Sequence, residues 1–225
     1  NGFLQIKNSI SYFDRDLSSP NLNFSGNQWN SFTEANYSLG NNKSDWIVGA
    51  NIYSDDFEEQ NSTNPRNQRN VTFGAFGNNT TDFSDKWVLE SGFRTDYSPD
   101  WGVFALPRVS LLWKASNKFS SRIGGGLGYK IPDIFTEEAA QLNFQNVLPI
   151  DKDNINAERS FGLNFDINYK GTIADKITFS VNQLFYLTSI DNALLLNSMS
   201  NGSFQFENAD GNILSKESET NIKFN

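Results

Sequence analysis

Cysteine and histidine are both absent from the 225 residues, and methionine occurs only once. Without cysteine the chain can have no disulfide framework, thiolate metal site or cysteine nucleophile. Without histidine it lacks the commonest general base and the commonest metal ligand. We therefore expect no catalytic residues, no metal site, no cofactor and no enzymatic activity.

Long hydrophobic runs are also missing. The mean hydropathy is −0.52, and no apolar stretch approaches the ~18 residues that a membrane-spanning helix needs. A spanning β-strand stays compatible with this value, because only alternate residues of such a strand face lipid. The net charge of −8 argues against nucleic acid as a partner, since phosphates require a basic surface.

Alternation of apolar and polar residues is the dominant pattern in the chain, and it predicts β-strands. In Lys86–Ser98, Trp87 and Phe93 share one face while Glu90, Arg94 and Asp96 share the other. The other predicted strands are Phe3–Phe13, Gln28–Leu39, Asp45–Tyr53, Asn70–Asn78, Arg108–Ala115, Ser121–Lys130, Ala157–Tyr169, Lys176–Thr188 and a long final one at Ser203–Phe224. The clearest strands, at about ten to thirteen residues, exceed the usual length in soluble sandwiches and suit tilted membrane-spanning strands.

The connections between these segments alternate in length. Short ones are expected at Gly40–Ser44, Thr80–Asp85, Ser116–Lys118 and Lys170–Asp175, and longer ones at Asp14–Asn27, Ser54–Arg69, Pro99–Pro107 and Ile131–Asn156. One short helix is expected within Ile134–Asn143. Tight turns on one side and long loops on the other are typical of outer-membrane barrels. The predicted fold is an all-β, antiparallel up-and-down transmembrane β-barrel segment of about ten strands.

Several stretches resemble the barrel of TonB-dependent outer-membrane receptors. A Pro-Arg strand opening, a basic residue before a short turn, and a Gly-aromatic-basic-x-Pro strand end correspond to Pro107, Arg108, Lys114, Gly128, Tyr129, Lys130 and Pro132. Asn154–Ser160 resembles the family's Asn-x-x-Pro-Glu-x-Ser opening, with Ala157 where proline is usual. An upstream strand motif corresponds to Trp87, Glu90, Gly92, Arg94, Asp96 and Tyr97. Near the end, Phe206, Asn208, Glu217 and Glu219 match a further strand motif more weakly. The resemblance covers roughly Lys86 to Asn225.

The resemblance implies that residues 1–225 are a single, incomplete β-barrel domain within a barrel of about 22 strands. It also implies a Gram-negative outer-membrane location and uptake of a scarce nutrient such as a ferric siderophore or cobalamin. The expected partners are the lipid bilayer, the protein's own N-terminal plug domain, the nutrient ligand, and the TonB complex, which acts through the plug. Neither the plug nor the closing strands are recognisable in the sequence.

Two groups of site residues follow from this interpretation. The expected lumen- and plug-facing residues are Glu90, Arg94, Asp96, Arg108, Arg122 and Glu158. The expected ligand-binding residues, aromatic or apolar groups near the long loops, are Tyr53, Trp101, Tyr129, Ile131 and Phe135. Each group also has a simpler interpretation. The lumen-facing residues could be general polar lining of a hydrated interior, and the aromatic residues could only pack their loops.

Two alternatives stay open at this stage. One is a smaller, complete barrel of about ten strands that acts as a porin or adhesin. The other is a soluble β-sandwich that binds glycan or protein. No motif identifies the ligand. The predicted loops are acidic and rich in asparagine, a composition that is compatible with a ferric complex, a corrinoid or a sugar.

Overall fold

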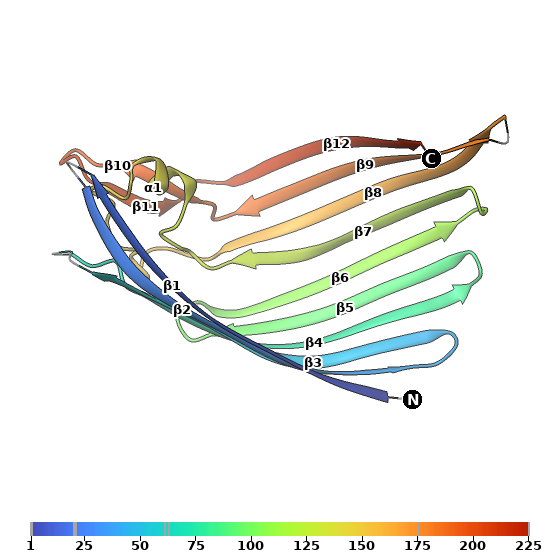
Figure 1. The fold of residues 1–225 in the computed structure, drawn as a ribbon, viewed down its shortest axis with the longest axis horizontal. Coiled ribbons are helices and arrows are strands. Elements are labelled where there is room, and N and C mark those ends of the chain that lie inside the picture. Colours follow the sequence, from blue (N-terminus) through green and yellow to red (C-terminus); the bar gives the residue numbers. More distant parts are fainter. Residues whose placement is uncertain (1, 20–21, 61, 63, 175, 225) are drawn as a thin grey trace.

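The computed structural model describes residues 2–19, 22–60, 62, 64–174 and 176–224. Ten strands of this part of the chain form one antiparallel sheet, in which each strand pairs with its sequence neighbour until β9, which pairs with β12. These strands are β1 (Gly2–Ser19), β2 (Leu22–Gly40), β3 (Ser44–Gln60), β4 (Gln68–Ser84), β5 (Trp87–Ser98), β6 (Gly102–Lys114), β7 (Phe119–Lys130), β8 (Glu158–Ile173), β9 (Ile177–Asp191) and β12 (Asn212–Phe224). Figure 1 shows the meander, with short turns at its right-hand end.

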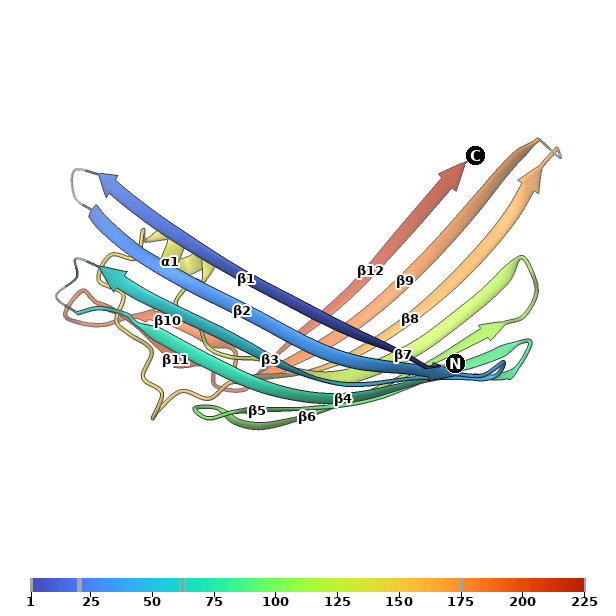
Figure 2. The ribbon, with the colours of Figure 1, turned by 60° about the horizontal axis from the view of Figure 1, so that its bottom comes forward.

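The sheet is curved into an open trough (Figure 2). In the ladder order, β1 and β12 are the two outermost strands and do not pair with each other. The expected barrel segment of about ten strands is therefore confirmed as an arc and not as a closed cylinder.

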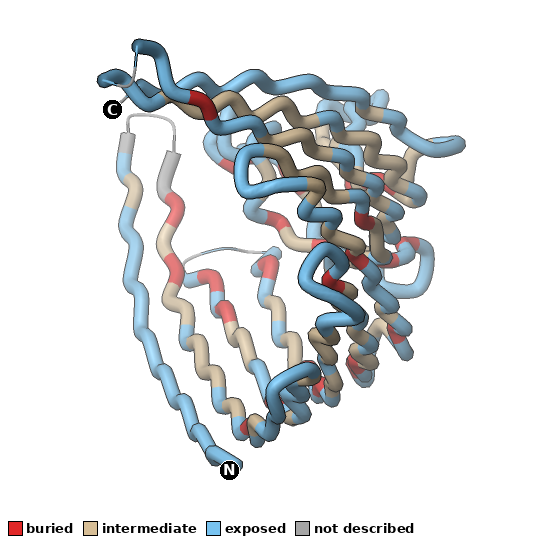
Figure 3. Tube along the Cα trace, turned by 90° about the vertical axis from the view of Figure 1, so that its right-hand side faces the viewer, coloured by how far each residue is buried: buried red, intermediate tan, exposed pale blue. Residues whose placement is uncertain are grey.

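The two faces of the arc have opposite chemistry, because successive side chains in a strand point to opposite sides. Convex-face apolar side chains are well exposed: Ile6 is 69% exposed, Val103 60% and Phe93 54%. The buried residues of the strands are largely polar or small, because the curvature crowds the concave face; they include Asn36, Asn51, Thr72, Asp96, Ser98 and Ser110. Figure 3 shows how sparse burial is along the tube. A soluble sandwich would bury the apolar face against a second sheet, and no second layer covers that face in the described part of the chain.

The strands extend further toward the long-loop end than the alternation predicted. Asp14–Asn27, expected as a long loop, belongs largely to the β1–β2 hairpin, where Asp14 pairs with Asn27 and Ser19 with Leu22. Pro99–Pro107 is also shorter than expected, because β6 begins at Gly102. Most of Ser54–Arg69 likewise lies in β3 and β4. The backbone ladder continues after the apolar alternation stops, since hydrogen bonding between strands needs no apolar side chains.

The end of the chain differs most from the prediction. Ser203–Phe224 is not one strand: it divides into β11 (Phe204–Asn208) and β12, and β11 pairs with β10 (Leu194–Ser198), which was not predicted. Gly211, with φ of 92°, lies at the break and allows a backbone conformation that other residues rarely adopt. The predicted short helix exists as α1 (Glu137–Gln141). No helix of the described residues is long and apolar enough to cross a membrane.

Candidate functional site

A polar network crosses the concave face between β3, β5 and β7. The Arg94 guanidinium donates to Asn51 Oδ1 (3.2 Å) and, through Nε, to the Asp96 carboxylate (2.9 Å). The Tyr129 hydroxyl donates to Asp96 Oδ2 at 2.8 Å. The Asp96 side chain is only 3% exposed, whereas that of Arg94 is 36% exposed. A nearly buried carboxylate is therefore held between a cation and a phenol, as buried charge requires.

Gly74 of β4 leaves the space that this network occupies. A Cβ at this position would lie 2.5 Å from Asn51 Oδ1 and 2.6 Å from both Arg94 Nη2 and Asp96 Oδ1. Gly74 pairs with Asn51 on one side and with Asp96 on the other. The absence of a side chain lets the groups of two non-adjacent strands meet across β4.

A second contact of Tyr129 lies where the ladder between β6 and β7 stops. These strands pair only over Arg108–Lys114 with Ser120–Gly126. Beyond that point the Tyr129 ring stacks on Phe104 with centroids 3.8 Å apart, and the Arg159 guanidinium lies 5.2 Å from the Phe104 centroid. Rings replace backbone hydrogen bonds as the contact in this part of the wall. Phe104 and Arg159 border a cavity of about 210 Å³.

The long loop 131–157 folds over the concave face at the long-loop end. Its residues Ile134, Phe144 and Val147 pack in one buried cluster with Phe24 of β2 and Phe206 of β11. Within the loop, Thr136 caps α1 by accepting the N–H of Ala139, and Phe144 and two asparagines take positive φ angles. The loop thus connects the two sides of the trough, and we call it the roof. Figure 1 shows α1 at the end of the sheet where β10, β11 and the ends of β1 and β2 lie.

A buried ion pair supports the roof from below. Arg66 Nε donates to Glu59 Oε2 at 2.8 Å, and Arg66 Nη1 donates to the Phe144 carbonyl. The Arg66 guanidinium also lies over the rings of Phe24 and Phe144, 5.5 and 5.8 Å from their centroids. The side chains of Arg66 and Glu59 are 8% and 3% exposed. A single arginine therefore joins the β3–β4 connection to the roof.

The structure gives the five expected ligand-binding residues different contacts. Tyr129 belongs to the network, and Tyr53 lies opposite Thr72 on the concave face with its hydroxyl donating to Asn30. Trp101 donates to Asn70 and packs against the roof cluster. Phe135 stacks edge-on against Phe57 at 4.8 Å, and Ile131 is half-buried in the first residues of the roof. Beside it, burial raises the pKa of the Asp133 carboxyl, against the lowering effects of the Phe135 N–H and of Lys130.

The expected lumen-facing residues share the face of Asp96, but they are spread along the wall. Arg108 and Arg122 line a cavity of about 350 Å³ with Ser110 and Asn164, and Glu90 borders another with Arg108. Glu158 accepts the backbone N–H of Leu194 and so fixes the start of β10. In the described part of the chain, no group of carboxylates is placed to hold a metal ion.

Sequence reasoning missed several residues of the site. Asn51 and Gly74 follow the alternation, yet nothing in the sequence marks them as neighbours of Arg94. Tyr129 was expected as a ligand-binding residue, but its contact with Asp96 was not foreseen. It shares its parity with the exposed Leu127, and it reaches the concave network where the β6–β7 ladder has ended. The Glu59–Arg66 pair could be foreseen only as two opposite charges near a loop.

Comparison with known proteins assigns the fold. A family model, TonB dependent receptor-like, beta-barrel, matches residues 2–216. The chain belongs to this family. The match includes residues 2–85, which resemble the family's motifs only in strand pattern. The match therefore covers β1 to β9 and the first residues of β12.

Solved receptor structures have the same fold at low identity. They include the siderophore receptor PirA from Pseudomonas aeruginosa (TM-score 0.71, 14% identity, 89% of this chain covered). They also include the hemophore receptor HasR from Serratia marcescens (0.68, 12%, 100%) and the iron transporter FrpB from Neisseria meningitidis (0.66, 16%, 88%). The aligned parts are 40%, 47% and 33% of those chains, so this chain spans less than half of each. No curated protein sequence matches the chain.

Proposed function

We propose that this chain is part of the wall of a Gram-negative outer-membrane receptor that takes up a scarce nutrient with energy supplied through TonB. One observation carries the proposal: the sheet exposes apolar side chains on its convex face and gathers polar ones on its concave face. A wall with lipid on one side and a wet interior on the other has this arrangement. Membership of the receptor family supports it.

The ligand is proposed to bind on the concave face beneath the roof. Tyr53, Trp101 and Tyr129 present rings there, next to the amides of Asn30 and Asn70. Ile131 and Phe135 belong to the roof itself. Aromatic surfaces flanked by polar groups suit a ferric siderophore, cobalamin or a similar compound. The names of PirA, HasR and FrpB, which concern siderophore, hemophore and iron, support this class.

The polar lining of the concave face is proposed to hold the plug domain. Arg94, Asp96 and Arg122 would pair with charged plug groups until energy is supplied, and Glu90, Arg108 and Glu158 would extend the same polar lining. The relatives are named as receptors and transporters, which supports a role without catalysis. The rival functions are less well supported, since a sandwich needs a second sheet and a small porin needs β1 to pair with β12.

The uptake of candidate nutrients by the full-length gene product tests the proposal. A deletion strain complemented with the complete gene should recover uptake of a ferric siderophore, haem or labelled cobalamin, and only when TonB is functional. Recovery that does not depend on TonB would indicate a passive pore. Unchanged uptake of every nutrient on deletion would refute the receptor role.

A further inference from the structure

Five lysines form a row across the short-turn end of the sheet: Lys86, Lys114, Lys118, Lys170 and Lys223. The Lys114 N–H donates to the Lys86 carbonyl at 2.7 Å, and the Lys170 N–H donates to the Lys118 carbonyl at 2.8 Å. Lys170 and Lys223 pair with the same residue of β9 from its two sides. Like charges on neighbouring strands destabilise a sheet when nothing offsets them. This row therefore calls for negative charge from another part of the protein.

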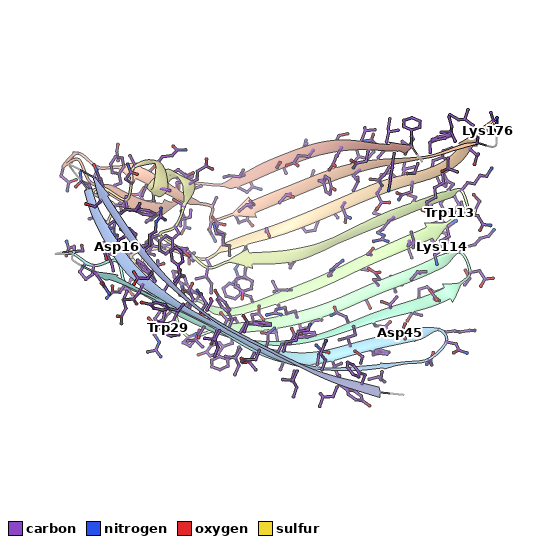
Figure 4. The ribbon with its side chains drawn as sticks, viewed as in Figure 1. Asp16, Trp29, Asp45, Trp113, Lys114 and Lys176 are labelled. Carbon is purple, nitrogen blue, oxygen red and sulfur yellow. The ribbon has the colours of Figure 1, made fainter. Side chains whose placement is uncertain are left out.

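The lysines of β6, β8 and β12 point into the trough. Each is next in sequence to a ring of the convex face, in the pairs Trp113–Lys114, Tyr169–Lys170 and Lys223–Phe224. The three rings are exposed, and successive side chains of a strand point to opposite sides of the sheet. The three ammonium groups therefore belong to the concave face. Figure 4 labels Trp113 and Lys114 at the short-turn end.

The row lines two adjoining cavities of about 410 Å³ each. Lys86, Lys114, Lys118 and Lys170 border the first, and Lys118, Lys170 and Lys223 border the second. Asp85 is the single carboxylate among the described residues that line them. No ion pair within the described residues involves any of the five lysines. The cavities therefore carry an excess of positive charge on the inner side of the wall, in a molecule of net charge −8.

An occupant of these cavities lies inside the barrel, because the strand lysines face the trough. A nutrient in transit would offset their repulsion only while it passes, whereas a resident chain segment offsets it permanently. The chain covers 40% of PirA, 47% of HasR and 33% of FrpB, and large transporter barrels enclose a plugged lumen. A further segment of the same polypeptide is thus the occupant that fits this position and this charge.

We propose that the five lysines bind an acidic segment of the protein's own plug domain at the short-turn mouth of the barrel. Carboxylates of that segment complete the ion pairs that the wall leaves open. The inference rests on the proposed function, in which the concave face holds the plug, and it adds the place and the chemistry of the contact. An acidic partner outside the barrel would meet the turns and not the inward lysines of β6, β8 and β12.

Zero-length cross-linking of the purified full-length receptor tests the contact. A carbodiimide joins a lysine to a carboxylate only when the two groups touch, and peptide mass spectrometry identifies the joined residues. The wild type should give links from Lys114, Lys170 or Lys223 to aspartate or glutamate residues of the plug. The Lys7–Glu34 pair, at 3.2 Å, is the positive control. A Lys7–Glu34 link without any link from the five lysines to the plug would overturn the proposal.

A triple variant shows whether the contact holds the plug. Lys114→Gln/Lys170→Gln/Lys223→Gln should lose these links, and protease should cut its plug about tenfold faster, as expected for the loss of three exposed ion pairs. The control variant Lys43→Gln/Lys152→Gln/Lys216→Gln removes the same charge outside the two cavities and should behave like the wild type. Equal rates of plug cleavage in the two variants would contradict the proposal.

Further outcomes separate the alternatives. If the five lysines give no plug link and resist acetylation only when millimolar citrate is present, the occupant is a free anion and the proposal fails. Absence of plug links with TonB-dependent uptake intact would overturn the lysine contact and leave the proposed function standing. Plug links in a receptor that takes up no nutrient would refute the uptake role and support the contact.

Discussion

At the scale of single residues, Gly74, which has no side chain, leaves the space that the concave network needs. A Cβ on Gly74 would stand 2.5 to 2.6 Å from three polar atoms, which is closer than real Cβ contacts allow. Gly77, in the same strand, has Val48 as its nearest neighbour at 3.8 Å. A side chain would therefore crowd its neighbours at position 74 but not at position 77.

Replacing Gly74 with alanine should destabilise the receptor, because Asn51, Arg94 and Asp96 must move apart. The expected cost is about 1–3 kcal/mol in the free energy of unfolding. Gly77→Ala is the control and should change it by less than about 0.5 kcal/mol. Urea titration of the full-length protein refolded in lipid measures both. Equal effects would mean that the network does not need the space at Gly74.

Removing Arg94 and Asp96 together separates stability from function. The double variant Arg94→Ala/Asp96→Ala leaves no uncompensated buried charge, so its stability should fall less than that of Asp96→Ala, which leaves Arg94 unpaired. If the pair holds the plug, nutrient uptake by the double variant should drop and the plug should become more sensitive to protease. Unchanged uptake and unchanged plug release would leave the pair as simple lining.

Sequence alternation could identify Arg94 and Asp96 as neighbours on one face, because residues two apart in a strand share a side. It could not place Asn51 beside them, since register between β3 and β4 is a non-local property. Tyr53 was named only for its place near a long loop, and the contact of its hydroxyl with Asn30 on the concave side was not foreseen. A period of two shows which residues of a strand share a face, but not whether that face is the concave or the convex one.

At the scale of elements, the roof depends on one buried pair. Arg66→Ala should leave the buried Glu59 carboxylate without its cation, with the backbone N–H of residue 66 still donating to it. Removing one partner of a buried ion pair typically costs about 3–5 kcal/mol. The loss should be local, because the pair contacts the loop and not the lower wall. Limited proteolysis of the full-length receptor should therefore cut within 131–157 much faster.

The matched control is Arg69→Ala. Arg69 pairs with Asp56 at 3.8 Å, with side chains 78% and 46% exposed, and exposed pairs contribute about 0–1 kcal/mol. Cleavage of the roof should stay at the wild-type rate. Comparable cleavage in both variants would show that the Glu59–Arg66 pair has no special role in holding the roof.

The parts of strands with clear apolar alternation could be predicted well, and the parts without it could not. The predicted strand Lys86–Ser98 and the observed strand Trp87–Ser98 differ by one residue, because one face of this strand is predominantly apolar. In Asp14–Asn27 neither face is consistently apolar, so the segment has the composition of a loop although it is largely paired backbone. The division at Ala209–Gly211 also lacks a hydrophobic signal, and the apolar parity continues across it.

At the scale of the whole molecule, the assignment of faces can be tested with two adjacent residues. Leu163 is convex and 44% exposed, while Asn164 lines the concave cavity near Arg122. Leu163→Arg should cost about 2–4 kcal/mol, since it places a charge in hydrocarbon near mid-strand. Asn164→Arg should cost clearly less. Folding of the full-length receptor into lipid vesicles measures the difference, and equal costs would contradict the membrane orientation.

The early end of the β6–β7 ladder has a mechanical consequence for the wall. Elsewhere, separating two neighbouring strands breaks a continuous series of amide–carbonyl bonds. Above Arg108 and Gly126 the contacts to be broken are between side chains: the Phe104–Tyr129 stack, the Tyr129–Asp96 hydrogen bond and the contact of Arg159 with Phe104. Amide protons of Val103–Leu106 and Leu127–Lys130 that face the seam should exchange with solvent before those of any neighbouring ladder. If the cylinder widens as cargo passes, this seam is where it yields first.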